Sequence, residues 1–230
     1  MKILSYEVKI YVLKDIPTNL LMQKQCELID TCFATDPVWL KWHQTNQPKQ
    51  YTLSGLIPLE ANKIYREGNV YSFTLRTANE ELGQLFMNIL QNAYTPFLKV
   101  LTIQSKILPQ VQLAKIYTLT PCVLKTDQGY WRTVMNLDAF EKRLIENLIK
   151  KYNHITNTKI DEDFHFFSHI KFDNHKPIAV PYKNIKLLGD KITLMVEPNP
   201  SAQKLAYTAL GCGLLEAGSR GFGFCGYKFV

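Results

Sequence analysis

Residues 211–230 read Gly-Cys-Gly-Leu-Leu-Glu-Ala-Gly-Ser-Arg-Gly-Phe-Gly-Phe-Cys-Gly-Tyr-Lys-Phe-Val and hold six of the eleven glycines of the 230-residue chain. An even spread would place about one glycine there. Glycine destabilises a regular element by roughly 0.5–1 kcal/mol relative to alanine, so the cluster needs a structural reason. The usual reasons are positive φ and close approach of another backbone or of a phosphate-bearing ligand. Because Arg220 adds a positive charge, the segment suits a polyanion; the alternative is a helix end, a glycine-rich turn and a last strand.

Three common motifs that contain glycine do not fit this segment. A dinucleotide-binding fingerprint would need a third glycine at the position that Glu216 occupies. A nucleotide triphosphate loop would need Gly-Lys-Ser or Gly-Lys-Thr, and a hydrolase nucleophile elbow would need Gly-x-Ser-x-Gly; the sequence has none of these.

The hydrophobic pattern repeats once along the chain, and each repeat predicts a βαββαβ unit. In the first half, the pattern predicts a helix opening at Pro17, a second helix over 79–92, and strands at 4–12, 51–58, 69–76 and 111–119. In the second half, it predicts helices over 137–152 and 199–210, a final strand after the glycines, and strands at 117–124, 130–136, 163–172 and 191–197. We therefore expect an α+β protein of two tandem ferredoxin-like (RNA-recognition-motif-like) domains, over residues 1–116 and 117–230.

Composition is that of a soluble globular protein with an anionic partner. Hydrophobic residues make up 46% of the chain and charged residues 20%, with a net charge of +7. Such a balance favours nucleic acid or a membrane surface as the partner. The five cysteines form no Cys-x-x-Cys pair, which argues against a disulfide framework or a structural zinc site. The polar N-terminus does not resemble a signal peptide and no apolar run could span a bilayer, so we expect a cytoplasmic protein.

The glycine-rich ending resembles the loop of the CRISPR-associated RAMP superfamily, with Gly-x-Gly at 211–213 and Gly-Phe-Gly at 221–223. It is most similar to the repeat-cleaving endoribonucleases of that superfamily, the "Cas six" family. Segment 119–124 and the helix containing Phe140 and Tyr152 resemble that family too. The resemblance implies two ferredoxin-like domains and RNA contacts by the loop residues Gly218, Ser219, Arg220, Gly221 and Gly223.

The resemblance also implies an activity. Members of the family cleave CRISPR repeat transcripts into guide RNAs without metal or cofactor. A base removes the proton of a ribose 2′-hydroxyl, which attacks the adjacent phosphate and leaves a 2′,3′-cyclic phosphate. The expected partner is therefore CRISPR repeat RNA, with other effector subunits or a second copy of the chain as further possibilities and no membrane.

In the family, a catalytic histidine follows the first helix, with a lysine a few residues on. His43 meets this description, followed by Lys49 and Tyr51, and the adjacent Trp42 could stack on a base. Histidine suits the role of base because its unperturbed pKa is about 6.5. The family's tyrosine before the histidine is missing, since residues 16–42 contain none. The alternatives are a surface histidine, a solvated lysine and a tyrosine that only begins a strand.

A second set of candidates lies in the predicted strand at 163–172. His165 and His169 are separated by an even number of residues, so they share a face with Phe167 and Lys171. Such a face could stack on and bind RNA, could be plain strand surface, or could hold zinc, although no cysteine or carboxylate pair accompanies the histidines.

Two functions from different classes follow from these observations. One is the metal-independent endoribonuclease with His43 as base. The other is a non-catalytic RNA-binding subunit of the same superfamily that holds guide RNA inside an effector complex. A third and more distant possibility is a ferredoxin-like protein that binds a small anion.

Overall fold

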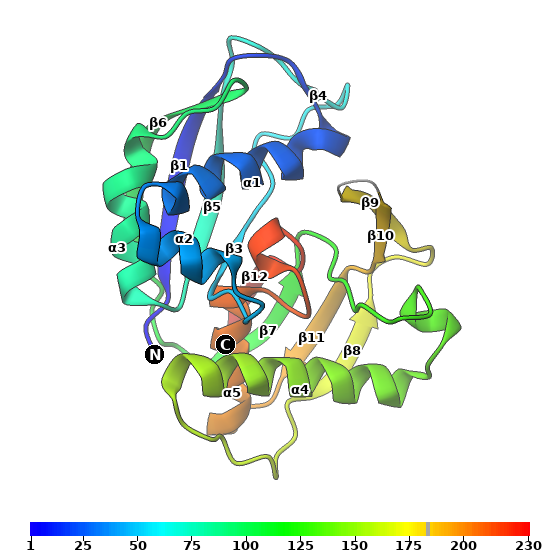
Figure 1. Cartoon of the computed structure of the whole chain (residues 1–230). Helices are drawn as coiled ribbons and strands as arrows, with labels where there is room; N and C mark the ends of the chain where they lie inside the picture. The colour runs from blue at the N-terminus through cyan, green and yellow to red at the C-terminus, as the bar shows by residue number, and fades with distance from the viewer. Residues whose placement is uncertain (183–184) are drawn as a thin grey trace.

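Two antiparallel sheets, each of four strands, form the framework of the chain (Figure 1). The computed structural model describes residues 1–182 and 185–230. The first sheet has the order β3-β5-β1-β6, with the strands β1 (Leu4–Val12), β3 (Tyr51–Leu53), β5 (Val70–Thr77) and β6 (Leu98–Ile107). The second sheet has the order β12-β7-β11-β8, with the strands β7 (Leu113–Thr118), β8 (Phe167–Phe172), β11 (Ile192–Val196) and β12 (Cys225–Phe229).

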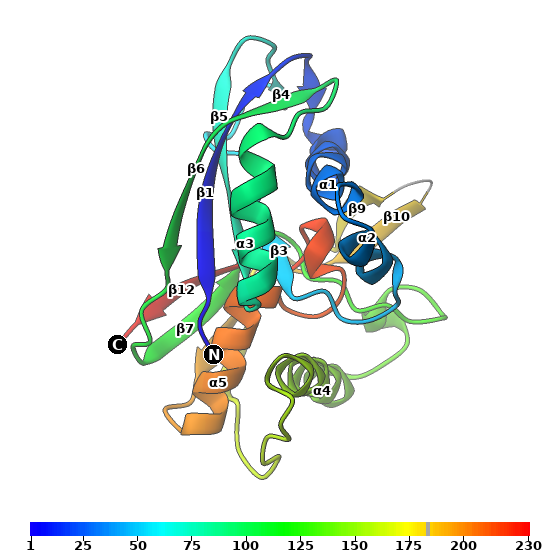
Figure 2. The same cartoon turned by 60° about the vertical axis from the view of Figure 1, so that its left-hand side comes forward.

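The helices cover one face of each sheet and complete two βαββαβ units. Figure 2 shows α1 (Thr18–Ala34), α2 (Pro37–Gln44) and α3 (Glu80–Ile89) on one side of the first sheet. The second unit contains α4 (Leu137–Thr156) and α5 (Pro200–Cys212). In both units the first strand lies between the third and the fourth, and the second strand forms an edge. The expected tandem ferredoxin-like architecture is therefore confirmed.

The remaining elements are short. β2 (Ile16–Pro17) pairs with β4 (Ile64–Tyr65), and β9 (Ile178–Tyr182) pairs with β10 (Ile185–Gly189) in a hairpin inserted between β8 and β11. Single turns of 3₁₀ helix lie at Leu90–Asn92, Trp131–Thr133 and Gly218–Arg220.

Local sequence explains why the central elements form where they do. In β1, the alternating residues Tyr6, Val8, Ile10 and Val12 are buried, so the strand presents one apolar face to the helices. The helix α5 begins after Asn199, whose side-chain oxygen accepts the backbone N–H of Ala202 at 2.8 Å, with proline at the first helical position.

Two predicted strands were wrong, and a third was displaced, since only residues 117–118 of the predicted strand at 117–124 belong to β7. The strand that closes the first unit is β6, not 111–119; the segment 113–118 is β7 and begins the second sheet. The sequence did not predict β6, because it is an edge strand in which only Leu98 and Val100 are buried, so it shows little alternation of apolar and polar residues. Residues 130–136 form no strand but contain the 3₁₀ turn at Trp131–Thr133, where Tyr130 and Trp131 turn to bind a buried carboxylate.

The division of the chain into 1–116 and 117–230 stays a proposal. Its boundary falls inside β7, a strand of the second sheet. The two hydrophobic cores are separate clusters, and Ile3 and Ala78, from segments next to the first-sheet strands β1 and β5, pack in the second cluster.

Candidate functional site

Three charged or titratable side chains meet where α1, α2 and the glycine-rich segment converge. Nη1 of Arg220 lies 3.1 Å and 2.8 Å from the two carboxylate oxygens of Asp30 on α1, although the two residues are 190 positions apart. Nε2 of His43, in the last turn of α2, lies 3.3 Å from Oδ1 of the same carboxylate. Figure 1 shows the glycine-rich segment, in red, directly below α1.

Mutual attraction keeps Asp30 and Arg220 ionised. Burial raises the pKa of Asp30, but hydrogen bonds from His43 and Arg220 outweigh it and hold the pKa below its usual range. Burial lowers the pKa of Arg220, and the neighbouring Asp30 carboxylate more than compensates, so the net shift is upward. A carboxylate and a guanidinium therefore face each other at neutral pH, beside the imidazole.

The imidazole of His43 is packed rather than exposed. Its ring stacks on Phe33 with the centroids 4.5 Å apart and an angle of 13° between the planes. When Nε2–H donates a hydrogen bond to Asp30, the lone pair of the ring lies on Nδ1. Nδ1 is buried and has no hydrogen-bond partner among the described residues. The arrangement favours the tautomer that carries its proton on Nε2.

Lys49 folds back on the end of α2. Its Nζ donates to the backbone oxygens of Trp42 at 2.7 Å and Thr45 at 3.0 Å, which lie at the end of α2, and it lies 4.4 Å from the centre of the Trp42 ring. Burial lowers the pKa of Lys49, and the charge of Arg220 lowers it further. The half-buried Trp42 ring also packs against Phe33 at 5.7 Å. Lys49 and Trp42 thus stand together next to the His43 site.

Tyr51 lies beneath the site. It is fully buried at the start of β3 and packs against Phe33 and Phe86. Burial raises the pKa of Tyr51 well above its usual value, and the Asp30 carboxylate adds to the rise, so the phenol stays neutral. Its hydroxyl is therefore within electrostatic reach of the Asp30–Arg220 pair.

The glycine-rich segment needs its glycines for close backbone packing. At Gly223, with a φ of 62°, a Cβ would overlap the carbonyl oxygen of Leu214. At Gly218, a Cβ would overlap the carbonyl oxygen of Cys212. The segment is a helix end, a 3₁₀ turn and the last strand β12, and it also places Arg220 against Asp30.

Lys151 of α4 binds the backbone of the glycine-rich segment. This residue was not predicted from the sequence. Its buried Nζ donates to the carbonyl oxygens of Gly213, at 2.8 Å, and Leu215. Burial lowers the pKa of Lys151 to about 8. Leu215 and Ala217 have positive φ values of 56° and 57°, so the ammonium stabilises a backbone that costs free energy.

Lys151 and Asp30, neither of which was predicted, could have been found from their positions on helix faces. Lys151 lies three positions after Leu148, on the apolar stripe of its helix. Asp30 lies four positions after Cys26 and three before Phe33, both of which are buried on the same stripe of α1. A charged residue inside a buried stripe needs a partner, although the stripe does not say which one.

The second set of predicted residues lies elsewhere, on the second sheet. His169 and Lys171 are exposed on the edge strand β8, and Lys171 pairs with Asp173 at 3.1 Å. His165 is exposed just before the strand, and its carbonyl oxygen accepts the Asn199 side chain at 2.8 Å. Phe167 does not share their face but packs on the core, because the strand register shifts between Met195 and Val196.

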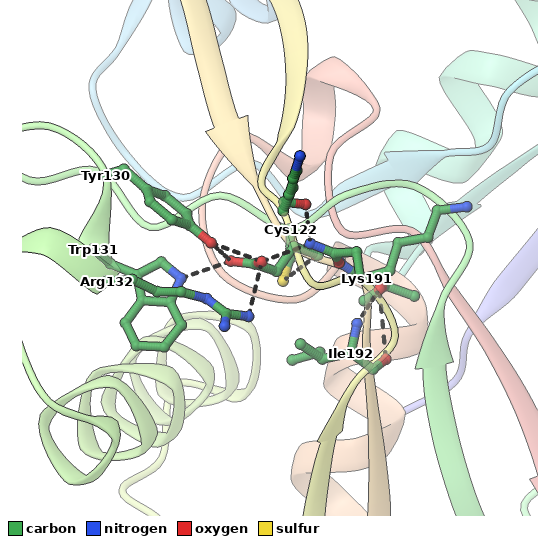
Figure 3. Close-up of polar contacts among 10 residues, drawn as sticks. Cys122, Tyr130, Trp131, Arg132, Lys191 and Ile192 are labelled. Atoms are coloured by element: carbon green, nitrogen blue, oxygen red, sulfur yellow. Dashed lines mark hydrogen bonds and ion pairs between the residues drawn. The ribbon is translucent and has the colours of Figure 1, made fainter.

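A buried carboxylate at the base of the β9–β10 hairpin binds Tyr130, Trp131 and Arg132 (Figure 3). Asp190, directly after β10, accepts hydrogen bonds from the Tyr130 hydroxyl at 2.7 Å, Trp131 Nε1 at 2.7 Å, Arg132 Nη2 at 3.1 Å and Asn174 Nδ2 at 2.8 Å. These bonds join the base of the hairpin to the 3₁₀ turn of the second unit. The hairpin is held where β9 contacts α1.

Over residues 1–182 and 185–230, no group of three histidine, cysteine or carboxylate side chains is placed to hold a metal ion. Within the same ranges, no helix has the length and apolar character needed to cross a membrane.

Comparison with known proteins gives one family and a consistent fold. A family model described as CRISPR associated protein Cas6, C-terminal, matches residues 105–227. A solved structure of a CRISPR associated protein Cas6 is 20% identical and covers 98% of this chain and 99% of its own, with a TM-score of 0.71. No curated protein matches the sequence significantly.

Two further solved structures share the same fold. The product of a Cas6-related gene from Pyrococcus furiosus is 17% identical, with 98% of both chains covered and a TM-score of 0.70. A RAMP protein described as binding different RNA substrates is 18% identical and covers 98% of this chain and 99% of its own, with a TM-score of 0.72.

Proposed function

The chain belongs to the CRISPR-associated Cas6 family, and from this premise we propose that it is an endoribonuclease that binds and cleaves CRISPR repeat transcripts. The reaction is attack of a ribose 2′-hydroxyl on the adjacent phosphate, which breaks the bond to the 5′-oxygen and leaves a 2′,3′-cyclic phosphate. The observation that carries the proposal is the placement of His43 and Arg220 on one carboxylate, a proton acceptor and a cation a few ångströms apart.

In this proposal His43 is the base. Asp30 orients the ring and holds the proton on one nitrogen, so the other nitrogen has a lone pair for the 2′-hydroxyl proton. In the described conformation both nitrogens are covered, one by Asp30 and one by packing. Substrate must therefore displace one of these contacts, which is common for catalytic hydrogen bonds that form only in the complex.

The cations near His43 have separate roles. Arg220 stabilises the charge that builds on the phosphate oxygens during attack. Lys49, whose pKa is lowered by burial, is the proposed proton donor to the leaving 5′-oxygen. Tyr51 is too deeply buried to contact RNA in this conformation. We propose that it packs against Phe33 and so holds the ring on which the His43 imidazole stacks.

RNA outside the cleavage site is proposed to run over the glycine-rich segment, Trp42 and the open face of the second sheet. One row of residues across the four strands of that face consists of His169, Met195, Lys115 and Lys228, each paired with the next. The next row contains Lys171, Thr193, Tyr117 and Gly226. Lysines on a sheet with an aromatic ring suit phosphates and unstacked bases.

The test is incubation of the purified chain with labelled CRISPR repeat RNA in excess EDTA, beside RNA with a single 2′-deoxy nucleotide at the cut site. The proposal expects one cut, a cyclic phosphate on the 5′ fragment and no cleavage of the deoxy RNA. Cleavage that persists with the deoxy RNA would contradict the mechanism.

The second candidate is a non-catalytic RNA-binding subunit of the same superfamily. The coverage of both His43 nitrogens and the missing tyrosine before His43 favour it. Tight, salt-sensitive binding of repeat RNA with no product at any time would select this candidate over the nuclease.

A further inference from the structure

A pocket of about 290 Å³ opens between α1 and the β9–β10 hairpin, next to the Asp30–Arg220 pair. The residues that line it include Met22, Cys26, Glu27, Asp30, Tyr182 and Arg220. Small-molecule pockets usually have volumes of roughly 300–1,000 Å³, so this pocket suits a ligand the size of a single unstacked base.

The floor and one wall of the pocket are apolar. Met22 packs against the glycine-rich segment, since a Cβ at Gly221 would lie 3.2 Å from its Cγ. Burial raises the pKa of Cys26 to about 11, which keeps the thiol neutral. The Tyr182 ring meets the Phe222 ring of the same segment edge to face, with the centroids 6.2 Å apart. An aromatic wall over an apolar floor is the arrangement on which unpaired bases stack.

Two carboxylates, those of Glu27 and Asp30, line the pocket, and Asp30 is paired with the guanidinium of Arg220. Lys24 Nζ, at 3.1 Å and 2.9 Å from the two oxygens, and Gln23, at 3.0 Å from Oε1, fix the carboxylate of Glu27. Each carboxylate oxygen can accept two hydrogen bonds, so Glu27 keeps acceptor capacity toward the pocket. Carboxylates pair with exocyclic amino groups of bases, as in contacts to cytosine N4.

We propose that this pocket binds the base of the nucleotide whose 2′-hydroxyl attacks, and that Glu27 selects a base with an exocyclic amino group over uracil. The proposal rests on the proposed nuclease function. The connection to the reaction is Asp30, which lines the pocket and also holds His43 at 3.3 Å. A base in the pocket leaves its phosphate beside Arg220, because the guanidinium lines the same pocket.

The first experiment measures single-turnover cleavage of repeat RNAs that differ only in the base 5′ to the cut: adenine, cytosine, guanine, uracil or none. The uracil and abasic RNAs are expected to react about tenfold more slowly, within the discrimination that one good base contact provides. In Glu27→Gln, the amide can also donate to uracil, so the ratio between amino-bearing bases and uracil should narrow. Glu67→Gln, an exposed glutamate on a loop of the first unit, is the matched control and should keep the ratio.

The second experiment tests occupancy without chemistry. Uncleavable repeat RNA with 2-aminopurine 5′ to the cut should lose fluorescence on binding to the wild-type chain, through stacking on Tyr182. Tyr182→Phe should retain the quenching and Tyr182→Leu should reduce it.

The outcomes separate this proposal from the proposed function. Equal cleavage rates with all four bases and the abasic RNA would overturn the pocket and leave the nuclease standing. Binding without cleavage would overturn the nuclease, and unchanged affinity across the five RNAs would then overturn the pocket as well. Failure to bind any of these RNAs would overturn both.

Discussion

The guanidinium of Arg220 and the carboxylate of Asp30 form an ion pair with Nη1 2.8 Å from Oδ2, and His43 binds the same carboxylate from α2. The Asp30–Arg220 ion pair joins α1 to the glycine-rich segment at the other end of the chain. The Asp30 carboxylate therefore lies between His43 and Arg220, the two candidate catalytic groups. We expect the negatively charged phosphate of the RNA to bind at this same position.

Asp30→Asn is expected to separate binding from catalysis. Loss of the competing charge frees Arg220 for phosphate, so the Kd for repeat RNA at low salt should fall by about threefold or more. The single-turnover rate should fall by about tenfold or more, because His43 loses the partner that orients it. Filter binding and quenched-flow cleavage on the same RNA measure the two effects. Asp127→Asn, on an exposed loop, is the control, and a loss of both affinity and rate in Asp30→Asn would refute the idea.

Lys151 should make stability depend on pH. Its pKa is about 8 in the folded chain against an ordinary value of 10.5, so between these pH values the unfolded chain binds more protons. The unfolding free energy therefore rises with pH in that window, because the burial of a charged ammonium is relieved. Between pH 7 and 9.5, urea unfolding should show a gain of about 2 kcal/mol in the wild type relative to Lys151→Met. Equal changes with pH in the two proteins would show that Lys151 does not titrate there.

Gly223→Ala should destabilise the glycine-rich segment. The new Cβ would overlap the Leu214 carbonyl oxygen at a residue with φ of 62°, so the substitution is expected to cost about 3 kcal/mol or more. Gly55→Ala is the matched control, because nothing lies within 4 Å of a Cβ there. Thermal unfolding of both variants checks this. A similar Tm for the two would mean that the segment is not packed as described.

Lys115 and Lys228 should contribute phosphate affinity without taking part in cleavage. Each lysine that releases a counterion adds about one to the slope of log K against log salt, so the double change to Gln should reduce that slope by about two. The rate at saturating protein should stay the same, because both side chains lie on the second sheet. Lys142→Gln, on the exposed side of α4, is the control. An unchanged slope in the double variant would remove this sheet from the RNA path.

Much of the fold could be predicted from local pattern, because alternation and helical stripes record which side of an element is buried. β1 and α4 show this most clearly, with Val8 and Ile10 in one and Leu144 and Leu148 in the other all fully buried. β6 was missed because an edge strand carries little of that pattern. The turn at Trp131 was mistaken for a strand because its apolar residues are turned inward by Asp190.

The site was predictable only in part. His43, Lys49 and Arg220 could be proposed from residue type and order, but their common partner could not, because Asp30 and Arg220 meet only through the packing of two units. Lys151 stood out only as a charge in an apolar stripe. Its partners are backbone carbonyls of the glycine-rich segment, which leave no mark in the sequence.

The most direct test of the account is the single-turnover cleavage rate of His43→Ala on repeat RNA in EDTA, with protein in excess over its measured Kd. Positioned proton transfer contributes about 10²–10⁴-fold, so if His43 is the base, the rate should be at least about 100-fold below that of the wild type with unchanged RNA affinity. A rate equal to that of the wild type would show that His43 is not the base and would contradict the site described here.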